Sequence, residues 1–351
     1  MKKSSISAER EYSVSIGGAW ANEVRELCSE RTRVAIITSK SFSPDLTSLN
    51  NVDAELHLFQ VPDGEEGKSI STLTNLWNWL GAAGFTRSDL VIGIGGGAIK
   101  DLAGFAAASW LRGLDWVAVP TSLAGMVDAS VGGKTGINSD YGKNLIGAFH
   151  SPIAVVIDPS WLTTLSDRDL SAGMAEVIKC GFIADPQILS LCEGKDVSTL
   201  RSETGLLEEL ISRSVAVKAS VVAADFKESF AREALNYGHT LGHAIEKFAK
   251  YQLRHGEAVS IGLVYAAELA HARKLISSDD LAQHRTVLAS FGLPVTYVRD
   301  AWQKLAPLLA LDKKSRGNTI RFVALQGIGT TTRLEDLTSA ELDAAYERIC
   351  S

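Results

Sequence analysis

The residue pattern changes near Asp158-Pro159-Ser160. Before this point short β-branched runs alternate with helical patterns, and strands are expected at 34–38, 56–59, 90–94 and 116–120. Strands separated by helices favour a mostly parallel sheet. After this point helical periodicity predominates, with helices expected at 172–182, 206–224, 233–251, 257–275, 281–291 and 340–349 and one strand at 320–325. The sequence therefore predicts an α/β domain over residues 1–158 and a mainly α-helical domain over residues 159–351.

Composition narrows the class of protein. A length of 351 residues is long for a single core, and 46% hydrophobic with 22% charged residues is ordinary for a globular chain. The net charge of −6 argues against a nucleic-acid partner. No apolar run indicates a signal or a membrane span, and Cys28, Cys180, Cys192 and Cys350 form no C-x-x-C pair. We expect a cytoplasmic protein with free thiols.

A glycine turn follows the third expected strand. Residues 90–94 run into Gly95-Gly96-Gly97, and a helical pattern follows over 102–110. Backbone N–H groups at such a helix start can bind a pyrophosphate, although a tight turn that needs small residues would look the same. The glycines lack the usual dinucleotide spacing, and Ser39 stands where an acidic ribose ligand is common. The turn by itself therefore does not identify an NAD site.

Three of the seven histidines lie within about twenty residues. His239 and His243 are four apart in an expected helix, so both imidazoles would project from one face, together with Arg232 and Asn236. Spacing alone favours either a metal site or an ordinary structural pair. A metal would need a further ligand, for which His255 or an upstream carboxylate is the candidate.

Seven motifs in order resemble the 3-dehydroquinate synthases of the sugar phosphate cyclase family. They are residues 101–106, 111–113, 127–138, 142–150, 172–179, 236–246 and 312–314. The resemblance implies a Rossmann-like NAD-binding domain followed by an all-α metal- and substrate-binding domain. It also implies conversion of 3-deoxy-D-arabino-heptulosonate 7-phosphate to 3-dehydroquinate and phosphate in the shikimate pathway, with catalytic NAD⁺ and Zn²⁺ or Co²⁺.

The resemblance further implies roles for individual residues. The metal ligands would be Glu176, His239 and His255, which moves His243 from the metal to the substrate. The catalytic residues would be Asp128, Lys134, Lys179, Lys218, Arg232, Asn236 and His243, and further substrate contacts would come from Arg112, Lys143, Asn144 and one of Lys313 or Lys314, taken as Lys314. The cofactor contacts would be Glu65, Lys68, Gly96, Gly97, Asp101, Thr121, Ser122, Lys134, Lys143 and Thr164.

The surroundings of four basic residues can also be predicted. Lys100 stands where the family more often has a small residue, and it would either lie beside the pyrophosphate or point away. Arg112 would reach the phosphate site of a neighbouring subunit, so a homodimer is expected. Lys134 and Lys143 are expected in glycine-rich loops, where a long side chain has no helical face to occupy.

Other functions share this architecture. A metal-dependent polyol dehydrogenase would have the same fold but no need for so many cations around an uncharged substrate. A related cyclase of the amino-dehydroquinate or 2-epi-5-epi-valiolone synthase type is the nearer alternative. The combination of Asn236, His243 and the 312–314 triplet favours the dehydroquinate synthase reading.

Overall fold

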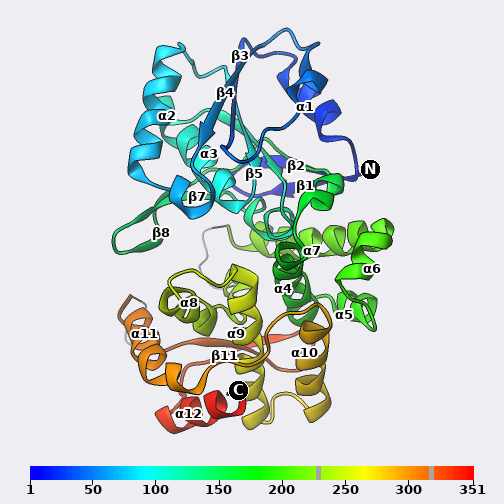
Figure 1. The fold of residues 1–351 in the computed structure, drawn as a ribbon, viewed down its shortest axis with the longest axis vertical. Helices are drawn as coiled ribbons and strands as arrows, with labels where there is room; N and C mark the ends of the chain where they lie inside the picture. The colour runs from blue at the N-terminus through cyan, green and yellow to red at the C-terminus, as the bar shows by residue number, and fades with distance from the viewer. Residues whose placement is uncertain (227–230, 316–319) are drawn as a thin grey trace. The chain divides into compact units, whose positions relative to one another are not determined.

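The computed structural model divides into two compact units, Met1–Thr164 and Leu165–Ser351 (Figure 1). It describes residues 1–226, 231–315 and 320–351, without the side chains of residues 231 and 310–315. The 3-10 helix η5 (Pro159–Thr164) belongs to unit 1, so the units divide six residues after the predicted boundary.

Unit 1 is built on a seven-stranded sheet in the order β1-β2-β9-β6-β5-β3-β4. Its strands are β1 (Lys2–Ser7), β2 (Glu11–Ile16), β3 (Arg33–Ser39), β4 (Glu55–Val61), β5 (Leu90–Gly95), β6 (Asp115–Pro120) and β9 (Ala154–Ile157). All neighbouring pairs are parallel except β1 with β2. The predicted mostly parallel sheet is thus confirmed. Strands β5 and β9 are buried at every residue, as expected for strands covered on both faces.

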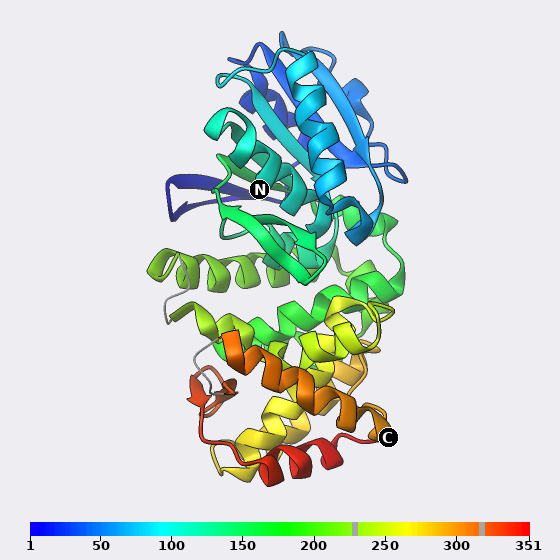
Figure 2. The same cartoon turned by 90° about the vertical axis from the view of Figure 1, so that its left-hand side faces the viewer.

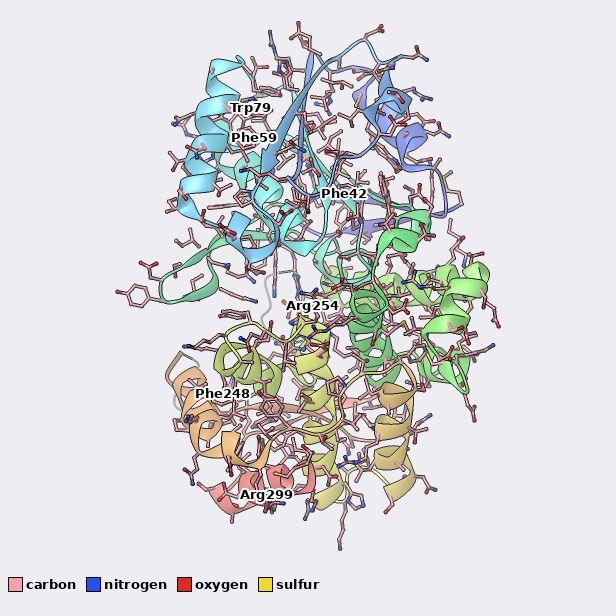
Figure 3. The ribbon with its side chains drawn as sticks, in the orientation of Figure 1. Phe42, Phe59, Trp79, Phe248, Arg254 and Arg299 are labelled. Carbon is pink, nitrogen blue, oxygen red and sulfur yellow. The ribbon has the colours of Figure 1, made fainter. Side chains whose placement is uncertain are left out.

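The helices of unit 1 cover this sheet. They are α1 (Trp20–Cys28), α2 (Ile70–Ala82) and α3 (Gly97–Ser109), with short turns η1 (Leu46–Leu49), η2 (Gly64–Gly67), η3 (Trp110–Arg112) and η4 (Gly125–Ala129). Trp79 of α2 packs on Phe59 of β4 with ring centroids 5.0 Å apart (Figure 3). The chain passes from β3 outward to β4 and returns to β5 on the other side of β3, so the strand order reverses between β3 and β5. Ligands of such sheets bind at the carboxyl ends of the strands at this reversal.

A β-hairpin replaces the loops expected around Lys134 and Lys143. Strands β7 (Lys134–Ser139) and β8 (Gly142–Phe149) pair antiparallel, with Gly136 opposite Gly147. A Cβ on Gly147 would lie 2.1 Å from the carbonyl oxygen of Thr135, so glycine allows the close approach of the two strands. The expectation of loops was wrong because these glycines serve strand pairing.

Unit 2 is mainly helical, as predicted. Its helices are α4 (Asp167–Ile183), α5 (Pro186–Cys192), α6 (Val197–Ser202), α7 (Thr204–Ala224), α8 (His239–Phe248), α9 (His255–Ala272), α10 (Ser278–Ser290), α11 (Trp302–Ser315) and α12 (Ser339–Arg348), with the short turns η6 (Ala231–Asn236) and η7 (Arg299–Ala301). The expected strand is β10 (Phe322–Leu325), which pairs with a second strand, β11 (Thr331–Leu334). Helix α9 is buried along most of its length and packs against α4, α8, α10 and α12 (Figure 1 and Figure 2).

The helix expected over 233–251 is interrupted. A 3-10 turn, η6, ends at Asn236, and α8 begins at His239 after Gly238, whose φ is 80°. A residue in the left-handed region cannot continue a right-handed helix, so Arg232 and Asn236 do not share a helical face with His239 and His243. Within the described ranges, no helix has both the length and the apolar composition required to cross a bilayer.

Candidate functional site

One carboxylate and two imidazoles come together in unit 2. Glu176 of α4, His239 at the start of α8 and His255 at the start of α9 place their ligand atoms within 4.8 Å of one another. Both His239 Nε2, at 3.4 Å, and His255 Nε2, at 3.3 Å, face the same oxygen of Glu176. These are the three residues that the resemblance implied as metal ligands.

Hydrogen bonds on the far side of each ring orient the two imidazoles. His239 Nδ1 lies 3.1 Å from the carbonyl oxygen of Tyr237, and His255 Nδ1 lies 3.2 Å from Glu246 Oε2. Because a carbonyl or carboxylate oxygen accepts, each Nδ1 donates, and a neutral ring then presents the lone pair of Nε2 toward Glu176.

The donor set suits a borderline divalent metal. Both carboxylate oxygens of Glu176 are buried without a hydrogen-bond partner among the described residues, although Lys179 forms an ion pair with one of them. A buried carboxylate with two imidazoles is a common catalytic donor set for Zn²⁺ and leaves coordination positions for substrate. The residues present therefore fit a Zn²⁺ or Co²⁺ ion.

Without a metal, burial and the contacts within the set shift the pKa of each of its three members. Burial acts to raise the pKa of Glu176, but the charges of Lys179 and His239 outweigh it and hold that pKa well below its usual range. Burial acts to lower the pKa of His255, yet its contacts with Glu176 and Glu246 raise it to about 10. Burial and the Lys179 charge lower the pKa of His239. A metal ion would displace the proton of His255, so metal affinity should fall as the solution is acidified.

His243 belongs to a different set. The rings of His239 and His243 have centroids 5.3 Å apart, but no potential ligand set among the described residues contains both. His243 is exposed and groups with Glu246 and His255. The interpretation from spacing, in which His239 and His243 converge on one ion, was therefore wrong, because position on a helical face says nothing of which side chains other helices bring near.

Three further cations predicted at the site are buried in unit 2. Lys179, Lys218 and Arg232 are 1%, 6% and 2% exposed. Arg232 donates through Nη1 to the Phe226 carbonyl at 2.6 Å. Burying a cation is costly unless an anion or several acceptors stabilise it. Asn236 is half-buried, and the side chains of Lys313 and Lys314 lie outside the described residues.

In unit 1, the glycine turn follows β5 at the reversal of strand order. A Cβ on Gly93 or Gly95 would lie 2.8 or 2.7 Å from side-chain carbons of Ala103 or Ile99, so strand–helix packing requires glycine there. Gly96 and Gly97 are different, since an added Cβ would meet its nearest atom at 3.4 and 3.3 Å. Packing within the protein therefore requires glycine less strictly at these two positions. Both lie at the start of α3, where a pyrophosphate would approach the backbone.

Other predicted cofactor residues follow neighbouring elements. Thr121 and Ser122 come directly after β6, which pairs with β5, and the Ser122 hydroxyl accepts from the Gly125 N–H at 3.2 Å. Thr164 is exposed at the end of η5, where its hydroxyl donates to the Trp161 carbonyl at 2.7 Å.

Asp101 is enclosed by two lysines. Lys68 Nζ lies 2.7 Å from one of its oxygens, and Lys100 Nζ lies 2.7 Å from the other. Lys100 also donates to the Lys134 carbonyl at 2.5 Å. Lys100 was expected either to lie beside the pyrophosphate or to point away. In the structure its side chain is buried and contacts Asp101 and the backbone of β7. Sequence reasoning missed the Lys100–Lys134 contact because it joins residues on different elements. It also missed the contacts of Tyr237 and Glu246 with the two imidazoles, because they depend on how the chain turns into α8 and α9.

The hairpin is tied to the predicted cofactor residues. Asn138 Nδ2 donates to Glu65 Oε2 at 2.5 Å, and Lys68 Nζ contacts the Asn144 side chain. Lys143 Nζ lies 4.0 Å from Glu65. Lys134 is exposed at the start of β7, and Asp128 is half-buried in η4. These hydrogen bonds and ion pairs bring together five of the residues predicted in unit 1, namely Glu65, Lys68, Asp101, Lys143 and Asn144.

Arg112 lies apart from these contacts. It is exposed, with a φ of 68°, between Leu111, whose φ is 48°, and Gly113. Arg87 Nε donates to the Leu111 carbonyl at 2.9 Å and supports this turn.

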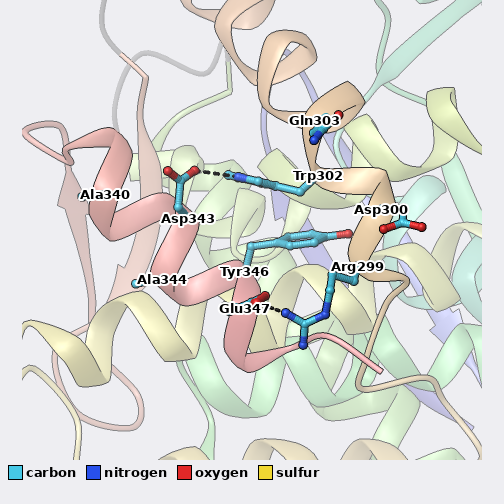
Figure 4. Close-up of a pocket in the computed structure, with 9 residues that line it drawn as sticks. All are labelled: Arg299, Asp300, Trp302, Gln303, Ala340, Asp343, Ala344, Tyr346 and Glu347. Atoms are coloured by element: carbon cyan, nitrogen blue, oxygen red, sulfur yellow. Dashed lines mark hydrogen bonds and ion pairs between the residues drawn. The ribbon is translucent and has the colours of Figure 1, made fainter.

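A surface hollow on unit 2 contains none of the predicted residues (Figure 4). Trp302 and Tyr346 stack there with centroids 4.5 Å apart. Trp302 Nε1 donates to Asp343 at 2.6 Å, and Arg299 forms an ion pair with Glu347. Trp302 and Arg299 thus bond to acidic residues of the same hollow, and we assign no substrate to it.

The two matching family models and relatives highly similar in sequence agree on one family. Residues 58–172 match the family described as 3-dehydroquinate synthase N-terminal, and residues 173–315 match 3-dehydroquinate synthase C-terminal. A 3-dehydroquinate synthase of Arthrobacter sp. (strain FB24) is 49% identical, covering 100% of this chain and 98% of the relative. The 3-dehydroquinate synthase of Mycobacterium leprae (strain TN) is 47% identical, covering 97% of this chain and 96% of the relative. A 2-epi-5-epi-valiolone synthase structure from Streptomyces hygroscopicus subsp. jinggangensis 5008, with NAD⁺ and Zn²⁺ bound, is 29% identical over 98% of both chains with a TM-score of 0.89.

Proposed function

The chain belongs to the 3-dehydroquinate synthase family, and from that membership we propose how its residues carry out the reaction. The activity is conversion of 3-deoxy-D-arabino-heptulosonate 7-phosphate to 3-dehydroquinate and phosphate, with NAD⁺ and a divalent metal. The observation that best supports the site is the convergence of Glu176, His239 and His255. When bound, the metal would polarise a substrate oxygen, and NAD⁺ would accept a hydride and return it to the same carbon.

Each unit has its own task in this proposal. Glu176, His239 and His255 hold the metal in unit 2. In unit 1 the N–H groups at Gly96 and Gly97 bind the pyrophosphate. Glu65, Lys68, Asp101, Thr121, Ser122, Lys134, Lys143 and Thr164 make the other cofactor contacts.

The buried cations bind the anionic substrate. Lys179, Lys218 and Arg232 belong to the same unit as the three proposed metal ligands, and their positive charges are complementary to the carboxylate and phosphate of the substrate. Lys134, Lys143, Asn144, Asn236 and Lys314 bind the remaining carboxylate, hydroxyl and phosphate oxygens. Asp128 and the exposed His243 hold or transfer protons in this proposal. An uncharged polyol would supply no such anion, which disfavours a dehydrogenase.

The assembly is a homodimer in this proposal. Arg112 of one subunit binds the substrate phosphate of the other, and the exposure of Arg112 on a turn with positive φ supports this role. We also place the protein in the cytoplasm, because none of its four cysteines forms a disulfide and three of them are buried.

The decisive experiment measures three products together. The protein is incubated with NAD⁺, Co²⁺ and the heptulosonate phosphate, and phosphate, 3-dehydroquinate and NADH are measured. We expect equal amounts of the first two, a requirement for NAD⁺, and no accumulation of NADH. One NADH per turnover would indicate a dehydrogenase, whereas turnover of sedoheptulose 7-phosphate in its place would indicate a sister cyclase.

A further inference from the structure

A buried imidazole lies outside every motif singled out in the sequence. His284 of α10 is 0% exposed. Its Nδ1 lies 2.7 Å from the carbonyl oxygen of Asp280, and its Nε2 lies 2.8 Å from the hydroxyl of Tyr237. The carbonyl can only accept, so Nδ1 bears the proton and Nε2 accepts from Tyr237. Burial lowers the pKa of His284 to about 4, which keeps the ring neutral at pH 7.

Tyr237 connects this imidazole to a proposed metal ligand. The Tyr237 ring is fully buried, and its carbonyl accepts from His239 Nδ1 at 3.1 Å. The next residue, Gly238, lies against α9, since a Cβ there would be 2.8 Å from the Leu263 side chain and 2.9 Å from the Leu263 nitrogen. Two contacts therefore fix the position of the Tyr237 carbonyl that orients His239. One is the hydrogen bond of the Tyr237 hydroxyl with His284, and the other is the packing of Gly238 on Leu263.

The same imidazole also contacts the helix that supplies Glu176. Phe182 of α4 stacks on His284 with ring centroids 3.5 Å apart and an interplanar angle of 7°. Phe182 and Glu176 belong to one continuous helix, so their relative position is set by helical geometry. His284 thus touches both segments that bring Glu176 and His239 together.

We propose that His284 and Tyr237 are positioning residues that set the direction of His239 Nε2 and thereby the affinity for the metal. This inference rests on the metal site proposed above. The reason is geometric: without the Tyr237–His284 hydrogen bond, the Tyr237 carbonyl can shift, and His239 then loses its fixed orientation toward Glu176. Contacts behind a metal-binding histidine commonly change affinity by about 10- to 100-fold.

The test compares two matched variants. Tyr237→Phe removes the hydroxyl that reaches His284. The control, Tyr265→Phe, removes the hydroxyl of another fully buried tyrosine in unit 2, which donates to the Leu342 carbonyl at 3.1 Å. The Co²⁺ dissociation constant of each apoprotein is measured by competition with a chelator, and the visible absorption spectrum of bound Co²⁺ is recorded.

We expect Tyr237→Phe to bind Co²⁺ about ten times more weakly, with an altered spectrum, and Tyr265→Phe to match the wild type in both. His284→Leu removes the acceptor instead and should weaken binding similarly, which serves if the first variant does not fold. The inference is overturned if Tyr237→Phe binds Co²⁺ as tightly as the wild type does, or if Tyr265→Phe loses as much Co²⁺ affinity as Tyr237→Phe. Either result leaves the metal site in place. If the wild type binds no Co²⁺, the metal site itself is wrong and the inference falls with it.

Discussion

Lys100 is a buried cation with partners on two different elements. It is 3% exposed, pairs with Asp101 next to it on α3 and donates to the Lys134 carbonyl at the start of β7. Burial acts to raise the pKa of Asp101, but the charges of Lys100 and Lys68 lower it below its ordinary value of 3.8. Because the folded pKa is depressed, this carboxylate stabilises the fold above pH 3.8, and that contribution is lost as the pH falls through the folded pKa.

Replacement of Lys100 by methionine should therefore act in two ways. The Lys134 carbonyl loses its buried donor, so the free energy of unfolding in urea should fall by about 1–3 kcal/mol. The pKa of Asp101 should rise, so acid unfolding should begin at a higher pH. Lys40→Met, at an exposed position in the same unit, is the control. Unchanged urea and acid midpoints in Lys100→Met would contradict this account of the residue.

The elements that supply the three proposed metal ligands meet at glycines. A Cβ on Gly256 of α9 would lie 1.8 Å from the Ala172 carbonyl oxygen of α4, and a Cβ on Gly262 would lie 1.9 Å from the Gly238 oxygen before α8. These backbone contacts determine how closely α9 approaches the other two segments. The separation of Glu176, His239 and His255 therefore depends on residues that would touch no metal.

Gly262→Ala tests this dependence. The added methyl must push the turn before α8 away from α9, which should cost at least about 1–3 kcal/mol of stability and move His239 away from His255. We expect a lower melting temperature together with weaker Zn²⁺ binding by equilibrium dialysis. Gly205→Ala in α7 is the matched control, because no atom lies within 4 Å of its added Cβ. Normal zinc affinity in Gly262→Ala would show that the site tolerates displacement of these helices.

The molecule as a whole divides its proposed chemistry between two units and, in our proposal, two subunits. The turn that presents Arg112 has positive φ at both Leu111 and Arg112, an arrangement that costs non-glycine residues about 1–2 kcal/mol each. Strained backbone of this kind is often retained where it serves function. A turn that directs Arg112 toward a partner subunit would account for it.

Subunit mixing provides the measurement. Arg112→Ala and Lys134→Ala should each be inactive as homodimers, because each site lacks one substrate contact. A heterodimer of the two variants has one site with both residues intact. Because a two-fold dimer has two equivalent sites, mixing should restore up to about half of the wild-type activity per heterodimer. The absence of recovery after verified subunit exchange would mean that Arg112 does not act across the interface.

Local pattern was sufficient for about half of the helices and strands, and the motifs were sufficient for the family. Periodicity located β3, β5, β6, α7 and α10 because each buries a face whose spacing is visible in consecutive residues. The motifs led to the proposed ligand set Glu176, His239 and His255 only by resemblance. Spacing grouped His239 with His243 as possible metal ligands, because spacing shows only which side chains share a face of one helix. It does not show which side chains from other parts of the chain lie nearby.

Packing decided the rest. The left-handed residue Gly238 interrupted the helix expected over 233–251, so that α8 begins only at His239. Close backbone contacts at Gly256 and Gly262 placed α9 against α4 and against the turn before α8. The buried direction of Lys100 and the contact of His284 with Tyr237 likewise join residues far apart in sequence. Such contacts arise when elements from distant parts of the chain bury their apolar faces together, and no short window of residues contains that information.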